Sequence, residues 1–120
     1  MILSDTQWEF VKDIAKLIVY AESKGYKLTQ GEGKRTSYQQ AEYVRTGKSK
    51  TMNSDHLIGL AKDFNIFFDY DGDGDKDYTG SLKNVVGICS DLGEYWKSLN
   101  VNNYWGGDWG WDTPHFGRKA

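Results

Sequence analysis

The first part of the chain repeats apolar and polar positions with the period of an amphipathic helix. The apolar residues on one face of this helix are Trp8, Val11, Ile14 and Ile18. Ser4 and Gln7 have the spacing of a capping box, and Gly25 is a natural stop. We therefore expect a helix that begins near Ser4, ends before Gly25 and buries this face.

Shorter elements follow this helix. Residues 26–29 can form a short strand, and Thr36 with Gln39 has a second capping-box pattern. That pattern predicts a shorter helix ending near Gly47. The stretch from Leu57 to Phe68 is mostly apolar and rich in Phe and Ile, which predicts a central strand.

The last third of the chain predicts one more helix and a glycine-rich end. The helix is expected to begin at Thr79 or Ser81 and to stop near Asn100. Its apolar face comprises Leu82, Val85, Val86, Cys89, Leu92 and Trp96. Gly and Trp alternate from Tyr104 to Trp111, as suits a strand and a tight loop. Because helices and strands mix without regular alternation, we expect an α+β fold.

Size and composition restrict the classes of protein that this chain can represent. At 120 residues and 38% hydrophobic content, we expect one domain spanning residues 1–120. A net charge of -2 argues against a nucleic-acid partner. Cys89 is the single cysteine, so no disulfide framework exists. No apolar stretch reaches the ~20 residues of a membrane span, so we expect no membrane insertion. The first five residues lack the basic start of a secretory signal, which predicts synthesis in the cytoplasm without a signal peptide.

The chain has only two histidines, and both can meet one carboxylate. His56 precedes Asp63 by seven positions, which is too far for contact within one straight strand. If Gly59 lets the backbone turn before the strand begins, both side chains can converge. His115 would join them from the far end of the chain. Two imidazoles and one carboxylate with a free fourth position are the ligand chemistry of a catalytic zinc.

Two further residues have side chains that a zinc hydrolase requires. Asp112 precedes His115 by three positions, so a turn can bring its carboxylate near the metal as the base that takes a proton from water. The guanidinium of Arg35 can bind a substrate carboxylate or stabilise a developing oxyanion. Taken singly, each of these residues is better explained as a turn, surface or core residue. The interpretation depends on their conjunction.

Three separated motifs resemble the family of zinc D-Ala-D-Ala carboxypeptidases and L-alanyl-D-glutamate endopeptidases, which includes VanY-like enzymes and phage endolysins. The pattern Ser-x-His-x-x-Gly-x-Ala-x-Asp is met at Ser54, His56, Gly59, Ala61 and Asp63. The arginine motif of the family resembles Arg35-Thr36, and the residues that follow it in the expected order are Gln40 and Gly47-Lys48-Ser49. The closing motif resembles Asp112 with His115. Residues 106–109, Gly-Gly-Asp-Trp, resemble the stretch before that motif in endolysins.

This resemblance implies a fold and residue roles. The fold would be a small antiparallel sheet backed by helices, as in hedgehog domains and D-Ala-D-Ala peptidases. The zinc ligands would be His56, Asp63 and His115, with Asp112 as the base and Arg35 as the electrostatic stabiliser. Residues beside the ligands or the substrate would be Ser54, Gln40, Asp108 and Trp109. Asp108 would orient His115 or Arg35, or alternatively hold the glycine-rich loop.

The chain departs from the family pattern at two site positions. Carboxypeptidase members usually carry Glu at the position of Asp112. An aspartate at this position is more similar to the endolysin branch. Gly117 stands where many relatives have an acidic residue. Lys62 also replaces a commonly apolar residue, and nothing in the sequence assigns it a role.

The resemblance further implies a substrate and a place of action. The substrate would be the stem peptide of peptidoglycan, cleaved by a monomeric L-alanyl-D-glutamate endopeptidase that reaches the cell wall of a phage-infected bacterium through a membrane pore made by another protein. Two alternatives stay open: a D-alanyl-D-alanine carboxypeptidase, and a zinc-stabilised cell-wall-binding module that has lost catalysis.

An acidic segment is a second candidate cation site. Asp69, Asp71, Asp73, Asp75 and Asp77 occupy alternate positions. With Asp69 as position one of a calcium loop, several carboxylates fall at favourable places, but Gly80 stands at position twelve instead of the usual Glu. A solvated hairpin with Asp-Gly turns is the alternative interpretation.

Overall fold

The computed structural model describes residues 2–31, 36–47 and 55–120. Its helices are α1 (Leu3–Ser23), α2 (Ser37–Arg45) and α3 (Val85–Leu99), and its short 3₁₀ helices are η1 (Asp55–Ile58), η2 (Thr79–Ser81) and η3 (Gly106–Trp109). Its strands are β1 (Lys27–Gln30), β2 (Ala61–Phe68), β3 (Asp77–Tyr78), β4 (Asn103–Trp105) and β5 (His115–Arg118). The fold is α+β, as the sequence predicts.

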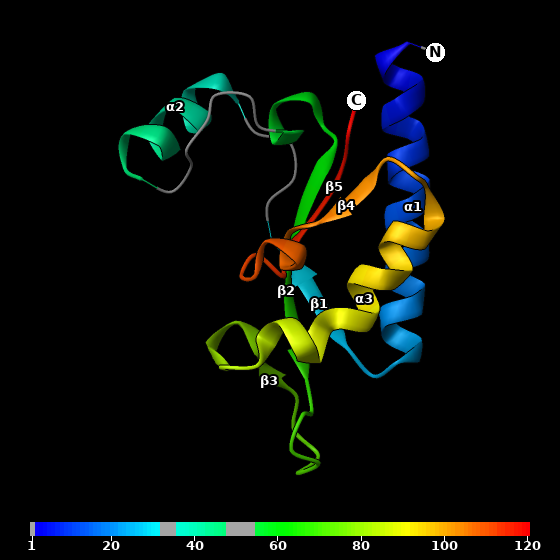
Figure 1. Cartoon of the computed structure of the whole chain (residues 1–120), viewed down its shortest axis with the longest axis vertical. Coiled ribbons are helices and arrows are strands. Elements are labelled where there is room, and N and C mark those ends of the chain that lie inside the picture. The colour runs from blue at the N-terminus through cyan, green and yellow to red at the C-terminus, as the bar shows by residue number, and fades with distance from the viewer. Residues whose placement is uncertain (1, 32–35, 48–54) are drawn as a thin grey trace.

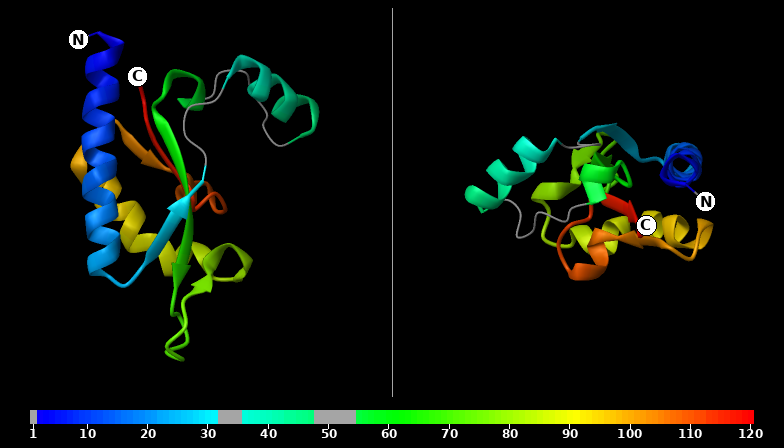
Figure 2. Two further views of the ribbon diagram at one scale, coloured as in Figure 1. Left: turned by 180° about the vertical axis from the view of Figure 1, so that it is seen from behind. Right: turned by 90° about the horizontal axis from the view of Figure 1, so that it is seen from above.

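The five strands form one antiparallel sheet in the order β1-β2-β5-β4, with β3 paired to the end of β2. Strand β2 runs through the middle of the molecule, and α1 and α2 lie far apart on opposite sides of it (Figures 1 and 2). Antiparallel pairing sets Asp63 opposite His115 and Tyr104 opposite Gly117. Residues directly opposite each other share a face of a sheet.

Helices α1 and α3 supply the core that covers one face of this sheet. The core residues on the two helices are Phe10, Leu17, Ala21, Cys89, Leu92 and Trp96. Phe64 and Ile66 on β2 and Phe116 on β5 meet them from the sheet. Because strand side chains alternate, Asp63 and His115 lie on the face opposite the core. The sheet therefore separates a packed side from a polar side.

The prediction for the buried face of α1 was right for Ile14, which packs against the core, and wrong for the other three residues. Trp8, Val11 and Ile18 are 60%, 53% and 42% exposed. The residues that α1 buries instead are Phe10, Asp13, Leu17 and Ala21. The helix carries two apolar stripes, and the packing of α3 decides which one is covered. No helix within the described residues has the length and apolar character needed to cross a membrane.

The start of α1 also differs from the prediction. The helix begins at Leu3, and the Asp5 carboxylate accepts the backbone N–H of Ile2. Ser4 and Gln7 do not form the expected box. The Gln7 side chain instead donates from Nε2 to the carbonyl of Ile58, 2.7 Å away, and so ties α1 to η1.

Other element boundaries follow the sequence more closely. The Thr36 capping box opens α2 as predicted, with the Thr36 hydroxyl accepting the Gln39 N–H. The central strand begins at Ala61 and not at Leu57, because residues 55–58 form η1. The predicted third helix is divided, since η2 ends at Ser81 and α3 starts at Val85.

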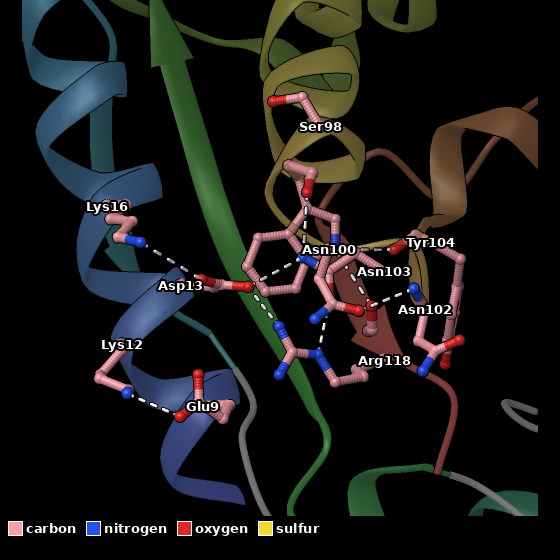
Figure 3. Close-up of polar contacts among 12 residues, drawn as sticks. Glu9, Lys12, Asp13, Lys16, Ser98, Asn100, Asn102, Asn103, Tyr104 and Arg118 are labelled. Atoms are coloured by element: carbon pink, nitrogen blue, oxygen red, sulfur yellow. Dashed lines mark hydrogen bonds and ion pairs between the residues drawn. The ribbon is translucent and has the colours of Figure 1, made fainter. Parts of the chain in front are cut away.

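A buried ion pair joins the end of β5 to α1. Arg118 donates from Nη2 to Asp13 Oδ2 and from Nε to Asn103 Oδ1, 2.8 Å away (Figure 3). Asn103 Nδ2 in turn donates to Asp13 Oδ2 at 3.3 Å and to the carbonyl of Trp96 at 3.0 Å. Buried charges need such partners, because desolvation of an unpaired charge is costly. This network anchors the strand that also carries His115.

Candidate metal centre

A tight turn brings His56 to the start of β2. His56 lies in η1, and Gly59 follows with φ of 70°, a conformation that favours glycine. The backbone N–H of Leu60 then closes the turn on the carbonyl of Asp55 at 3.0 Å. The chain therefore turns at Gly59, as predicted, and places His56 next to Asp63.

Strand pairing brings His115 to the same position from the other end of the chain. His115 Nδ1 lies 3.1 Å from Asp63 Oδ1, and His56 Nε2 lies 3.4 Å from the same oxygen. One donor atom from each of the three residues lies within 4.8 Å of the others. A tetrahedral zinc with bonds of about 2.0–2.1 Å separates its ligand atoms by about 3.3–3.4 Å. The two distances are close to that separation, so the donor set fits a zinc ion in both chemistry and spacing.

The three side chains differ in exposure. His56 and His115 are buried, whereas the Asp63 side chain is 26% exposed. Burial raises the pKa of Asp63, but hydrogen bonds with His115 and His56 outweigh it and hold this pKa well below its usual range. Asp63 thus stays ionised, as a metal ligand must be.

Asp112 lies in the turn before β5. Its backbone carbonyl accepts the N–H of His115 at 3.1 Å. A Cβ added to Gly106 would lie 2.9 Å from the Cβ atoms of both Asp112 and His115. The absence of a side chain at Gly106 therefore lets both residues pack against the start of η3. The Asp112 side chain is partly exposed.

Asp108 pairs with a lysine in the described structure, and its predicted role toward Arg35 lies outside the described residues. The Asp108 carboxylate accepts from Lys97 Nζ at 2.8 Å, so it ties η3 to α3. No contact with His115 is found among the described residues. The alternative interpretation, that Asp108 holds the glycine-rich loop, agrees with this contact.

Aromatic rings enclose His115. The ring centroid of Trp109 lies 5.4 Å from that of His115, and the ring of Tyr104 lies 5.5 Å from it. Trp109 is 53% exposed and Trp111 is 67% exposed, whereas Trp105 is buried. Trp109 is therefore beside the site and accessible to a ligand.

Three further predicted site residues are Arg35, Ser54 and Gln40. Arg35 and Ser54 lie outside the described residues. Gln40 lies on α2 and is fully buried. In the sequence it follows the arginine motif. Their proposed roles stay predictions.

The sequence analysis missed Tyr104 and Asp55. The Tyr104 hydroxyl donates to Asp55 Oδ2 and lies 3.2 Å from His115 Nε2. Burial and the Asp55 carboxylate raise the pKa of Tyr104 well above its usual value, so the phenol keeps its proton. The strand register reveals Tyr104, because a residue paired with Gly117 shares the face of His115.

The acidic segment forms the loop between β2 and β3, at the opposite end of β2 from η1 (Figure 1). Carboxylate oxygens of Asp69, Asp71, Asp73 and Asp77 lie within 4.8 Å of one another; Asp75 is not in this group. The backbone N–H of Gly74 donates to Asp69 at 2.9 Å and lowers the pKa of Asp69. Asp77 Oδ2 is buried and has no hydrogen-bond partner among the described residues.

Comparisons with known proteins agree with this geometry. The chain is 36% identical over 104 residues to the L-alanyl-D-glutamate peptidase of Listeria phage A118, an alignment that covers 83% of this chain. The chain spans about a third, 33%, of the length of that relative. The crystal structure of the Serratia marcescens L-Ala D-Glu endopeptidase ChiX superposes with a TM-score of 0.62 at 25% identity, over 90% of this chain and 79% of that chain.

A family profile described as D-alanyl-D-alanine carboxypeptidase matches residues 47–118, a range that contains all three candidate ligands and Asp112. The match covers more than half of the chain. On this evidence the chain belongs to the D-alanyl-D-alanine carboxypeptidase family of peptidases.

Proposed function

We propose that this protein is a zinc-dependent peptidase that hydrolyses the stem peptide of peptidoglycan. The observation that carries the proposal is the convergence of His56, Asp63 and His115 at spacings that fit tetrahedral zinc. Three protein ligands leave a fourth position for water or substrate, which distinguishes a catalytic from a structural site. The family membership supports the same reaction class.

The residues around the centre have distinct roles in this proposal. Zinc, when bound, supplies a Lewis acid that polarises the scissile carbonyl. Asp112 accepts a proton from the attacking water and passes it to the leaving amine. Arg35 stabilises the negative charge that develops on the carbonyl oxygen. The exposed ring of Trp109 forms one wall for the peptide.

The cleaved bond is proposed to be the one between L-Ala and D-Glu. The names of the Listeria phage and Serratia relatives support this specificity, whereas the family description supports cleavage between two D-Ala residues. Mass spectrometry of muropeptides after digestion separates the two. Products cut between L-Ala and D-Glu are expected, and loss of terminal D-Ala alone would support the carboxypeptidase. The proposal also places the action of the protein at the cell wall, after release through a pore made by another protein.

A base variant tests whether the centre is catalytic. Asp112→Asn is expected to reduce kcat by about 10²–10⁴-fold, the usual contribution of a positioned base. Asp108→Asn is the matched control, because Asp108 is an acidic residue nearby that pairs with Lys97. Unchanged muropeptide cleavage by a folded Asp112→Asn would contradict the assignment of the base. Failure of the wild-type protein to cleave muropeptides would support the non-catalytic binding module.

A calcium ion in the loop between β2 and β3 is a second, separate part of the proposal. The convergence of four carboxylates and the buried, unpartnered Asp77 Oδ2 support it. Calorimetry with calcium is expected to give heat that disappears in Asp71→Asn. No heat at millimolar calcium would leave the solvated hairpin as the explanation of this loop.

A further inference from the structure

A chain of polar contacts leads from the candidate ligand His115 into the protein. The first contact joins His115 Nε2 to the Tyr104 hydroxyl at 3.2 Å. The second joins that hydroxyl to Asp55 Oδ2 by a short hydrogen bond. The other ring nitrogen of His115, Nδ1, faces Asp63. The two nitrogens of this ring therefore have different surroundings.

When zinc takes the place of the hydrogen between His115 Nδ1 and Asp63, the donors and acceptors in this chain allow one arrangement of protons. An ionised carboxylate only accepts hydrogen bonds, so the single hydrogen of the Tyr104 hydroxyl is directed to Asp55. The phenolic oxygen is then left as an acceptor, and His115 Nε2 must carry the hydrogen that it receives. In a neutral imidazole the other nitrogen, Nδ1, is consequently unprotonated. Nδ1 is the atom that faces Asp63 and His56.

We propose that Tyr104 and Asp55 are positioning residues that fix the tautomer and ring orientation of His115 so that Nδ1 is presented to zinc. This inference rests on the zinc site of the proposed function. It assigns to two residues outside the ligand set the role that hydrogen-bond partners of metal-binding histidines commonly have. Neither residue touches substrate in this scheme.

The backbone around Tyr104 is adapted to this contact. Tyr104 pairs with Gly117 across β4 and β5, and its ring lies directly over that glycine. A Cβ added to Gly117 would be 2.3 Å from Tyr104 Cζ and 2.4 Å from its hydroxyl oxygen. Any side chain at position 117 would therefore displace the ring from His115. The glycine that departs from the family pattern is thus what gives Tyr104 its place.

The second partner is held just as firmly by the turn that carries His56. Asp55 is the first residue of η1, and its backbone carbonyl accepts the Leu60 N–H at 3.0 Å. Asp55 immediately precedes His56, so the same turn positions one candidate ligand and supports another. The Tyr104 hydroxyl connects η1 and β4 to β5 through these two contacts.

Zinc affinity is the quantity that tests the role. Tyr104→Phe removes the hydroxyl and keeps the ring, and we expect zinc to bind about 10–100-fold more weakly in competition with a chelator. Asp55→Ala, in which Tyr104 stays, is expected to weaken zinc in the same direction. The visible spectrum of the cobalt(II)-loaded protein should change in both variants, because the ligand geometry changes. These readouts do not depend on peptidase activity.

A matched control is present elsewhere in the chain. Tyr26 also donates its hydroxyl to a carboxylate, that of Asp91, and also to the carbonyl of Ile88, far from the two histidines. Tyr26→Phe therefore loses a similar buried hydrogen bond without touching the site. It is expected to lower thermal stability and to leave zinc affinity and the cobalt spectrum unchanged.

The outcomes separate this inference from the proposed function. Equal zinc affinities for Tyr104→Phe and Tyr26→Phe would overturn the inference even if the wild-type protein cleaves muropeptides. If Tyr104→Phe does not fold, wild-type affinity and spectrum in Asp55→Ala would overturn it alone. A wild-type protein that binds zinc tightly and cleaves no muropeptide would overturn the proposed function, and weakened zinc binding in Tyr104→Phe would still support the inference.

Discussion

The buried ion pair between Asp13 and Arg118 allows a quantitative prediction about how strand β5, which carries His115, is held in place. Arg118 is 3% exposed and Asp13 is 6% exposed, so both charges are almost fully removed from water. Asp13→Asn keeps the shape of the side chain and removes the negative charge. The guanidinium of Arg118 is then left buried with only neutral amide oxygens as side-chain acceptors in the described structure, that of Asn103 and that of the new asparagine.

The expected cost follows from this burial. Removing one partner of a buried ion pair typically destabilises a protein by about 3–5 kcal/mol. For a domain of 120 residues, 1 kcal/mol corresponds to a shift in Tm of about 4 °C, so Asp13→Asn should lower Tm by about 12–20 °C. Zinc affinity should fall as well, because Arg118 ends the strand that begins with His115.

The control uses an exposed ion pair on the same helix. Lys12 and Glu9 are 2.7 Å apart with side chains 41% and 46% exposed (Figure 3). Such a pair contributes about 0–1 kcal/mol, so Lys12→Ala should be nearly neutral. Urea denaturation of both variants gives the comparison. If Asp13→Asn costs no more than Lys12→Ala, the reasoning that burial makes the Arg118 pair critical is refuted.

Three further predictions concern packing, ionisation and metal binding. A Cβ added to Gly93 in α3 would lie 2.1 Å from Cε3 of Trp105, so Gly93→Ala should destabilise by about 1–3 kcal/mol in urea denaturation. Gly87→Ala is the control on the exposed side of the same helix. Its Cβ would meet only the exposed side chain of Asn84, 2.6 Å from Oδ1, which can move away, so this variant should lose less stability than Gly93→Ala; equal losses would contradict the packing argument. Burial raises the pKa of the Cys89 thiol from 9.0 to about 11. The unfolded chain therefore ionises first, and the free energy of unfolding should fall by up to about 3 kcal/mol between pH of about 9 and 11. The fall should be smaller in Cys89→Ala; an equal slope would exclude the thiol as its cause. Zinc at about 100 times its Kd should stabilise the protein by about 2.7 kcal/mol, and the gain should vanish in Asp63→Ala. A gain that persists in that variant would mean that zinc binds elsewhere.

Much of the candidate site was predictable because its residues are rare or oddly spaced in the chain. Only two histidines are present, and Gly59 between His56 and Asp63 indicated the turn that brings them together. Tyr104 and Asp55 were missed because tyrosine and aspartate are common and carry no signal without the strand register. The pairing of Asp108 with Lys97 was missed, since only the packing of η3 on α3 brings the two side chains together.

The sequence by itself determined the α+β class, the capping of α2 at Thr36 and the set of candidate ligands, because these depend on local spacing and on side-chain chemistry. Tertiary structure alone decided which apolar stripe of α1 is buried, since both stripes satisfy the helical period and only contact with α3 and the sheet distinguishes them. It also decided the surroundings of His115. Pairing across β4 and β5 sets Tyr104 over Gly117. The spacing of residues within one strand does not encode which residue of another strand it faces.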